Sequence, residues 1–146
     1  MSLQIVILAA GQGKRMYSNT PKVLHQLAGK AMLERVVEVA QQLNPDAIHI
    51  IYGHGGEQIR AAQAHLKVNW ILQKEQLGTG HAVKQALSHI PPDSQILILS
   101  ADVPLIKAET LQALIESSRL PQGKFAPLSL LLATLETPTG LGRIVR

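Results

Sequence analysis

The chain has 146 residues, of which 46% are hydrophobic and only 3% aromatic, with no cysteine and a net charge of +4. This length suits one domain with an aliphatic core, and the lack of cysteine excludes a disulfide scaffold and a thiolate metal site while agreeing with a cytoplasmic location. No run approaches the ~20 apolar residues of a membrane span, and the cations are scattered without aromatic clusters, so neither a membrane nor a nucleic-acid partner is expected.

Apolar strand patterns and amphipathic helix patterns alternate along the chain. Strands are predicted at 4–10, 47–53, 68–73, 95–102 and 128–136, and helices at 31–43, 57–66, 81–90 and 108–118. This alternation predicts an α/β fold with a mostly parallel sheet and helices on both faces. The last residues, 137–146, resemble the start of another strand, so we expect a fragment or a shortened relative of a longer protein.

Helical spacing predicts which side chains of these helices face the sheet. The expected inner faces are Leu33, Val36, Val37 and Ala40 in the first long helix, Val83, Ala86, Leu87 and Ile90 in the third, and Leu111, Leu114 and Ile115 in the last. Since ligands of open parallel sheets bind outside the carboxyl ends of the strands, the segments after each strand are the candidates for a site.

The first such segment is the turn "GQGKR". Gly11 and Gly13 allow backbone N–H groups to converge on an anion, while Lys14 and Arg15 add positive charge. The pattern is neither a full dinucleotide fingerprint, because Met16 stands where a third glycine belongs, nor a Walker A loop. The turn is therefore predicted to bind phosphate, with an ordinary strand-to-helix turn as the alternative.

A second cation follows in "TPKVL". Pro21 can open a short helix because it fixes φ and has no N–H to leave unpaired. Lys22 then lies in the first helical turn, where a cation opposes the helix dipole unless an anion is present. This mismatch favours a functional Lys22 over a solvated one.

Two further segments supply amides and a carboxylate. After the third strand, Gln73 and Gln76 can face the edge of a base, Gly78 allows close backbone approach, and Thr79 is expected to cap the next helix. After the fourth strand, Asp102 suits Mg²⁺, which usually takes one or two protein carboxylates, although an ordinary Asp turn is the alternative. The six histidines show no metal-ligand spacing and are interpreted as surface or loop residues.

In this order, the motifs resemble those of the bacterial N-acetylglucosamine-1-phosphate uridylyltransferases. The stretches that carry the resemblance are "LAAGQGKRM", "PKVLHQLAGKAM", "YGHGG", "QLGTGHA", "DVPLI" and "PTGLGRI". The resemblance covers essentially the whole chain. It implies a Rossmann-like, GT-A-like three-layer nucleotidyltransferase fold that is truncated, with residues 1–146 forming its nucleotide-binding part. In that family a β-helix acetyltransferase domain follows, and no such domain is expected in this chain.

The resemblance also implies a reaction. The family transfers UMP from UTP to N-acetylglucosamine 1-phosphate, giving UDP-N-acetylglucosamine and pyrophosphate for peptidoglycan and lipopolysaccharide precursors. By analogy Arg15 and Lys22 are catalytic and neutralise the phosphates, while Asp102 binds Mg²⁺. The implied nucleotide and substrate residues are Leu8, Ala9, Ala10, Gly11, Gly13, Lys22, Gln73, Gln76, Gly78, Thr79, Ser100, Ala101, Asp102 and Gly142.

The chain departs from the family in two respects. Ser100 and Ala101 precede the metal-binding Asp, where the family has an aromatic or polar residue followed by glycine. The second Mg²⁺ ligand and two sugar-binding residues of the family lie beyond residue 146, so impaired transfer is expected. The family is trimeric through its β-helix part, and trimerisation is therefore not carried over to this chain.

Two alternatives to the uridylyltransferase remain open. One is a nucleotidyltransferase of a different base specificity, for which competition between UTP, GTP and CTP discriminates. The other is a non-catalytic module that binds a nucleotide sugar and ends naturally near residue 146.

Overall fold

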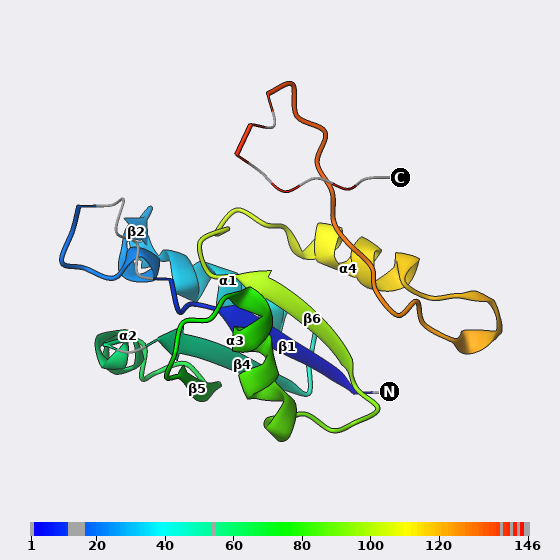
Figure 1. Cartoon of the computed structure of the whole chain (residues 1–146), viewed down its shortest axis with the longest axis horizontal. Helices are drawn as coiled ribbons and strands as arrows, with labels where there is room; N and C mark the ends of the chain where they lie inside the picture. Colours follow the sequence, from blue (N-terminus) through cyan, green and yellow to red (C-terminus); the bar gives the residue numbers. More distant parts are fainter. Residues whose placement is uncertain are drawn as a thin grey trace. The chain divides into compact units, whose positions relative to one another are not determined.

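The computed structural model describes residues 2–11, 17–53, 55–137, 139–140, 142 and 144. The chain divides into two compact units, Met1–Gln112 and Ala113–Arg146. In the described part, no helix is long and apolar enough to cross a membrane. The first unit contains all the regular β-sheet that the structure describes (Figure 1).

A four-stranded parallel sheet, in the order β5–β4–β1–β6, forms the centre of the first unit. Its strands are β1 (Leu3–Leu8), β4 (Ala47–Gly53), β5 (Asn69–Gln73) and β6 (Gln95–Ser100). The chain moves outward from β1 through β4 to β5, and then returns to the other side of β1 to form β6. The order therefore reverses beside β1, and this reversal is where such sheets bind ligands.

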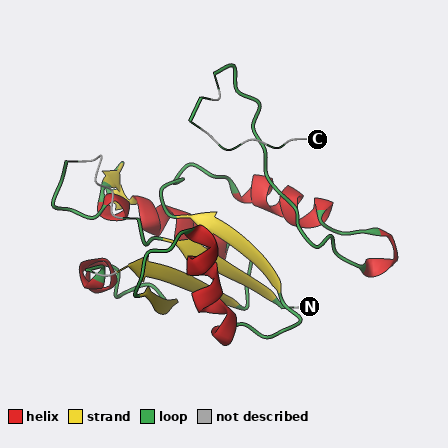
Figure 2. Ribbon diagram, viewed as in Figure 1, coloured by secondary structure: helices red, strands yellow, loops and turns green. Residues whose placement is uncertain are grey.

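Short helices and one small ribbon connect the strands (Figure 2). The helices are η2 (Lys22–Leu24), α1 (Met32–Gln41), α2 (Glu57–Ala62), α3 (Thr79–Ala86), η3 (Leu87–His89), α4 (Ala108–Ser117) and η4 (Pro121–Gly123). The ribbon pairs β2 (Gln26–Leu27) with β3 (Lys30–Ala31) in antiparallel fashion. Parallel strands need such crossovers, because a two-residue hairpin cannot join them.

The core is aliphatic, as the composition predicts, and helices cover both faces of the sheet. On one face, α3 packs Ala82 and Ala86 against Val6 and Ile51. Neighbouring side chains of β1 point to the opposite face, because side chains alternate along a strand. Figure 1 shows α3 in front of the sheet and α1 behind it. The predicted parallel sheet with helices on both faces is thus confirmed.

Helix faces were predicted with mixed success. The four inner residues expected in α1, namely Leu33, Val36, Val37 and Ala40, are all fully buried. In α3 the expected face is correct in part, because Ala86 is buried and Ile90 packs against the core, whereas Leu87 is 51% exposed and Ala82, which was not expected, is buried. The structure begins α3 at Thr79 and changes to a 3-10 turn at Leu87, which explains why Leu87 leaves the inner face.

The predicted strand at 128–136 is absent. Within the described residues of the second unit, the one β interaction is an isolated antiparallel bridge between Arg119 and Phe125. The segment 128–136 finds no strand partner there, and Leu128, Leu130 and Leu132 are exposed. A strand needs a neighbour to satisfy its backbone hydrogen bonds, so an apolar run alone does not form one. Likewise, no strand is present among the described residues of 137–146.

His49 corrects the expectation that the histidines lie on the surface. It lies within β4, is 1% exposed, and its Nε2 is 2.9 Å from Oε1 of Gln4 on the neighbouring strand. Its Nδ1 is 3.4 Å from Nδ2 of Asn69 on β5. Burial, followed by the charge of His89, lowers the pKa of His49 below 6.5. The central strands therefore contain a polar row that favours a neutral imidazole.

This row predicts a pH dependence of stability. Below about pH 6.5 the unfolded chain protonates His49, whereas the folded chain does so only at lower pH, so the unfolded state binds more protons in that window. We expect the free energy of unfolding to be largest above pH 6.5 and to fall as the pH drops through the lowered pKa. Urea unfolding at a series of pH values measures this dependence. His49→Gln should flatten it.

Candidate nucleotide-binding site

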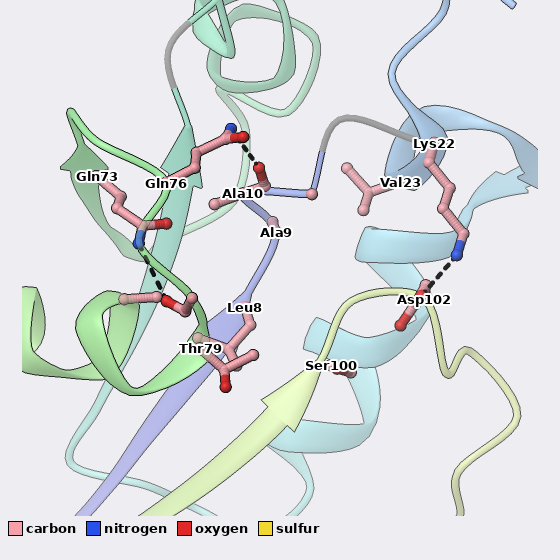
Figure 3. A pocket seen from close by; sticks show the side chains of 13 residues that line it. Leu8, Ala9, Ala10, Lys22, Val23, Gln73, Gln76, Thr79, Ser100 and Asp102 are labelled. Atoms are coloured by element: carbon pink, nitrogen blue, oxygen red, sulfur yellow. Dashed lines mark hydrogen bonds and ion pairs between the residues drawn. The ribbon is translucent and has the colours of Figure 1, made fainter. Parts of the chain in front are cut away.

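A pocket of about 290 Å³ lies at the carboxyl edge of the sheet, where the strand order reverses. Its lining comes from the last residues of β1, β5 and β6 and the segments that follow them, together with η2 and the first half of α3. The lining residues are Leu8, Ala9, Ala10, Gly11, Lys22, Val23, Gln73, Gln76, Gly78, Thr79, Ala82, Ser100 and Asp102 (Figure 3). The structure thus brings together segments that are up to ninety-four residues apart, from Leu8 to Asp102.

The turn after β1 is held by hydrogen bonds on several sides. The N–H of Ala9 donates to the carbonyl oxygen of Ile51 at 2.8 Å, and the N–H of Ala101 donates to that of Leu8 at 3.0 Å. The side-chain Nε2 of Gln76 donates to the carbonyl oxygen of Ala10 at 2.7 Å. The backbone that enters the glycine-rich turn is therefore fixed by three neighbouring segments.

Gly53, at the end of β4, is a residue that sequence reasoning missed. A Cβ atom built there would lie 2.9 Å from the carbonyl oxygen of Ala10 and would collide with the side-chain amide of Gln76. No φ anomaly marks this position, since the requirement is for space rather than for an unusual backbone conformation. Only the three-dimensional approach of two strand ends reveals that the side chain must be absent.

We therefore expect Gly53→Ala to displace the turn after β1. Because backbone as well as a side chain must move, the free energy of unfolding should fall by about 1–3 kcal/mol, the usual cost of overpacking. Urea unfolding measures this loss. Gly80→Ala is the matched control, because a Cβ there meets nothing within 4 Å. An unchanged stability of Gly53→Ala would contradict the close approach.

A cation and a carboxylate face each other at one side of the pocket. Nζ of Lys22 lies 2.6 Å from Oδ2 of Asp102, and the two side chains are 35% and 40% exposed. Pro21 precedes η2 as predicted, and Lys22 is the first residue of that turn. Such an exposed pair contributes little to stability, so its charges are available to a ligand.

Buried and exposed amides occupy the other side of the pocket. Gln73 ends β5 and is 2% exposed, whereas Gln76 lies in the exposed loop that follows. Gly78 is the N-cap of α3 with φ +100°, a conformation that favours glycine. The prediction that Thr79 caps α3 is wrong, because Thr79 is its first helical residue and no side chain caps this end.

The described lining of the pocket does not include every predicted site residue. Ala101 is fully buried and is not among the lining residues. Gly142 belongs to the second unit. Gly13 and Arg15 lie outside the described residues.

Two lining residues, Val23 and Ala82, were not predicted. Ala82 lies one helical turn after Thr79, so helical spacing was an available signal for Ala82, whereas Val23 is the chain neighbour of Lys22 and has no such signal.

The donor set favours a divalent cation shared with a ligand. Among the described residues, no three His, Cys, Asp or Glu side chains gather into a metal-binding group. Of the described residues that line the pocket, Asp102 is the one that carries a carboxylate. Mg²⁺ commonly binds through one or two carboxylates, with phosphate oxygens and water completing its octahedron, so this site fits Mg²⁺ that arrives with a phosphate ligand.

The profile of the MobA-like NTP transferase domain matches residues 5–128. The chain belongs to this family. The matched range contains every residue that lines the pocket.

Two curated relatives of the family illustrate the similarity. Over 146 residues, which is 100% of the chain, it is 67% identical to the bifunctional protein GlmU of Legionella pneumophila (strain Lens), of which it covers 32%. Over 147 residues, again 100% of the chain, it is 54% identical to the bifunctional protein GlmU of Xylella fastidiosa (strain M23), of which it covers 31%. The chain therefore spans about a third of the length of the curated relatives that it matches.

Solved structures resemble the family fold seen here. One is Rv0371c from Mycobacterium tuberculosis H37Rv, with a TM-score of 0.68 and 24% identity, covering 79% of this chain and 59% of that one. Another is the nucleotidyl transferase Mth528 from Methanothermobacter thermautotroptrophicus, with a TM-score of 0.71 and 20% identity, covering 79% and 57%. These likenesses concern the fold alone, and together with the family match they confirm the predicted Rossmann-like α/β architecture.

Proposed function

We propose that the pocket binds UTP with Mg²⁺, as the nucleotide-binding part of an enzyme that makes UDP-N-acetylglucosamine. The reaction is the transfer of UMP from UTP to N-acetylglucosamine 1-phosphate, with release of pyrophosphate, in the cytoplasm. One observation carries the proposal. The Lys22–Asp102 pair lies on one side of the pocket and the buried Gln73 amide on the other, so charged and uncharged ends of a nucleotide each meet matching groups (Figure 3).

The charged side suits a triphosphate. The ammonium of Lys22 can leave Asp102 and neutralise phosphate oxygens, since both side chains are partly exposed. Asp102 is then free to hold Mg²⁺. Bound Mg²⁺ supplies charge neutralisation at the phosphates and favours departure of pyrophosphate. Arg15, which the resemblance makes a second phosphate ligand, lies outside the described residues.

The similarity to the two GlmU proteins supports uridylyl transfer, because it extends over the whole chain. For this chain the proposal is nucleotide binding. Transfer to the sugar phosphate is proposed for the longer protein that the relatives represent.

Calorimetric titration of the chain with UTP and Mg²⁺, with CTP and GTP as controls, tests the proposal. Binding selective for UTP supports it. Preference for CTP or GTP would favour a nucleotidyltransferase of different base specificity. Absence of binding to all three nucleotides would contradict a preformed nucleotide site in this chain.

A further inference from the structure

The side-chain amide of Gln73 has a defined orientation. Its Nε2 donates to the carbonyl oxygen of Gly78 at 3.2 Å and lies 2.9 Å from Nδ1 of His81. A backbone carbonyl oxygen only accepts hydrogen bonds, so the nitrogen and not the oxygen of this amide must face Gly78. In Figure 3 the nitrogen of Gln73 carries a dashed line and its oxygen carries none.

His81 is the partner of the second amide hydrogen. With one hydrogen of Nε2 on Gly78, the other points to Nδ1 of His81, which therefore accepts. With Nδ1 accepting, the other ring nitrogen carries the proton, so the side-chain amide nitrogen of Gln85 does not donate to it and donates instead to the carbonyl oxygen of His81 at 3.3 Å. The two N–H groups of the Gln73 amide thus have different acceptors, and together these fix the plane of the amide. The hydrogen bond to Gly78 alone would leave the amide able to rotate about it.

The orientation leaves one acceptor for a ligand. Gln73 is 2% exposed and lines the pocket, and no described residue donates to its Oε1. A fixed carbonyl oxygen attracts a ring N–H and repels a ring nitrogen that carries a lone pair. Uracil presents an N–H at N3, whereas cytosine, which is nearly the same size, presents an acceptor there.

We propose that His81 is a positioning residue that fixes the Gln73 amide with its oxygen toward the pocket and thereby selects uracil over cytosine. This inference rests on the proposed nucleotide-binding function. It assigns to His81 a role in base selectivity without contact with the base. Any side chain that places a hydrogen-bond acceptor where Nδ1 of His81 lies should fill this role, so an imidazole is not required.

A pair of variants separates this role from a structural one. His81→Asn retains an acceptor near the place of Nδ1, whereas His81→Leu removes it and fills similar volume. We expect the ratio of UTP to CTP affinity, measured by calorimetry with Mg²⁺, to fall about tenfold in His81→Leu and to be largely restored in His81→Asn. Lys84→Gln, on the exposed side of the same helix, is the control and should leave the ratio unchanged.

The inference is overturned if His81→Leu remains folded by circular dichroism and keeps the wild-type ratio. A nucleotide-free measurement tests the orientation separately. In nuclear magnetic resonance spectra, the Gln73 side-chain amide hydrogens should exchange slowly with solvent in the wild type and in His81→Asn, and faster in His81→Leu. If the wild-type chain binds neither UTP nor CTP, the proposed function fails. If the Gln73 amide hydrogens exchange at the same rate in all three proteins, the positioning role of His81 is overturned.

Discussion

Asp102→Asn should remove the effect of Mg²⁺ on UTP binding. An asparagine preserves the size of the side chain but supplies no negative charge for the cation. We expect Mg²⁺ to tighten UTP binding to the wild-type chain and to leave binding to the variant within about twofold of its Mg²⁺-free value. The wild-type affinity in Mg²⁺ should exceed that of the variant by at least about tenfold, the scale at which altered metal sites lose affinity. Calorimetry with and without a chelator gives all four values.

The matched control is Glu109→Gln, which removes an exposed carboxylate in the first turn of α4. It changes the net charge equally and should keep the full Mg²⁺ effect. If Asp102→Asn also kept that effect, the metal would be bound elsewhere, and the assignment of Asp102 would be wrong.

Lys22→Met should weaken the binding of UTP without unfolding the chain. Methionine keeps the length of the side chain and removes its charge, so about 10- to 100-fold of affinity should be lost, as for one charge-assisted hydrogen bond. The midpoint of urea unfolding should change little, because the Lys22–Asp102 pair is more than a third exposed on both sides. Paired titration and unfolding experiments separate the two effects.

Lys67→Met serves as the control for Lys22→Met. Lys67 is exposed and lies outside the pocket, so its replacement tests for a general effect of net charge on the attraction of UTP. Equal losses in the two variants would show that Lys22 acts through the overall field and not through contact with phosphate.

The sequence predicted the sheet because its buried strands are read from nearly continuous aliphatic runs, such as "QIVIL" and "AIHIIYG". The second of these runs was predicted at 47–53, the bounds that β4 has in the structure. The run at 128–136 has an equally apolar composition, yet it forms no strand. The difference is the availability of a hydrogen-bonding neighbour, which is a property of the fold and not of the segment.

The place of the site was predictable for a similar reason. Parallel strands end at one edge of a sheet, so residues that follow different strands converge there, as Gln73 and Asp102 do. The roles of Gly53 and His81 were not predictable, because they depend on which neighbours approach in space. No turn motif requires a glycine at position 53, and nothing in the residues around His81 indicates that its ring contacts Gln73.

The most direct test of the central claim is a crystal structure of the chain with UTP and Mn²⁺, in which anomalous scattering locates the metal. The account predicts the metal beside Asp102, phosphate oxygens near Lys22, and the uracil N3–H donating to Oε1 of Gln73. A nucleotide bound in the reverse direction, or outside the pocket between Leu8 and Asp102, would contradict it.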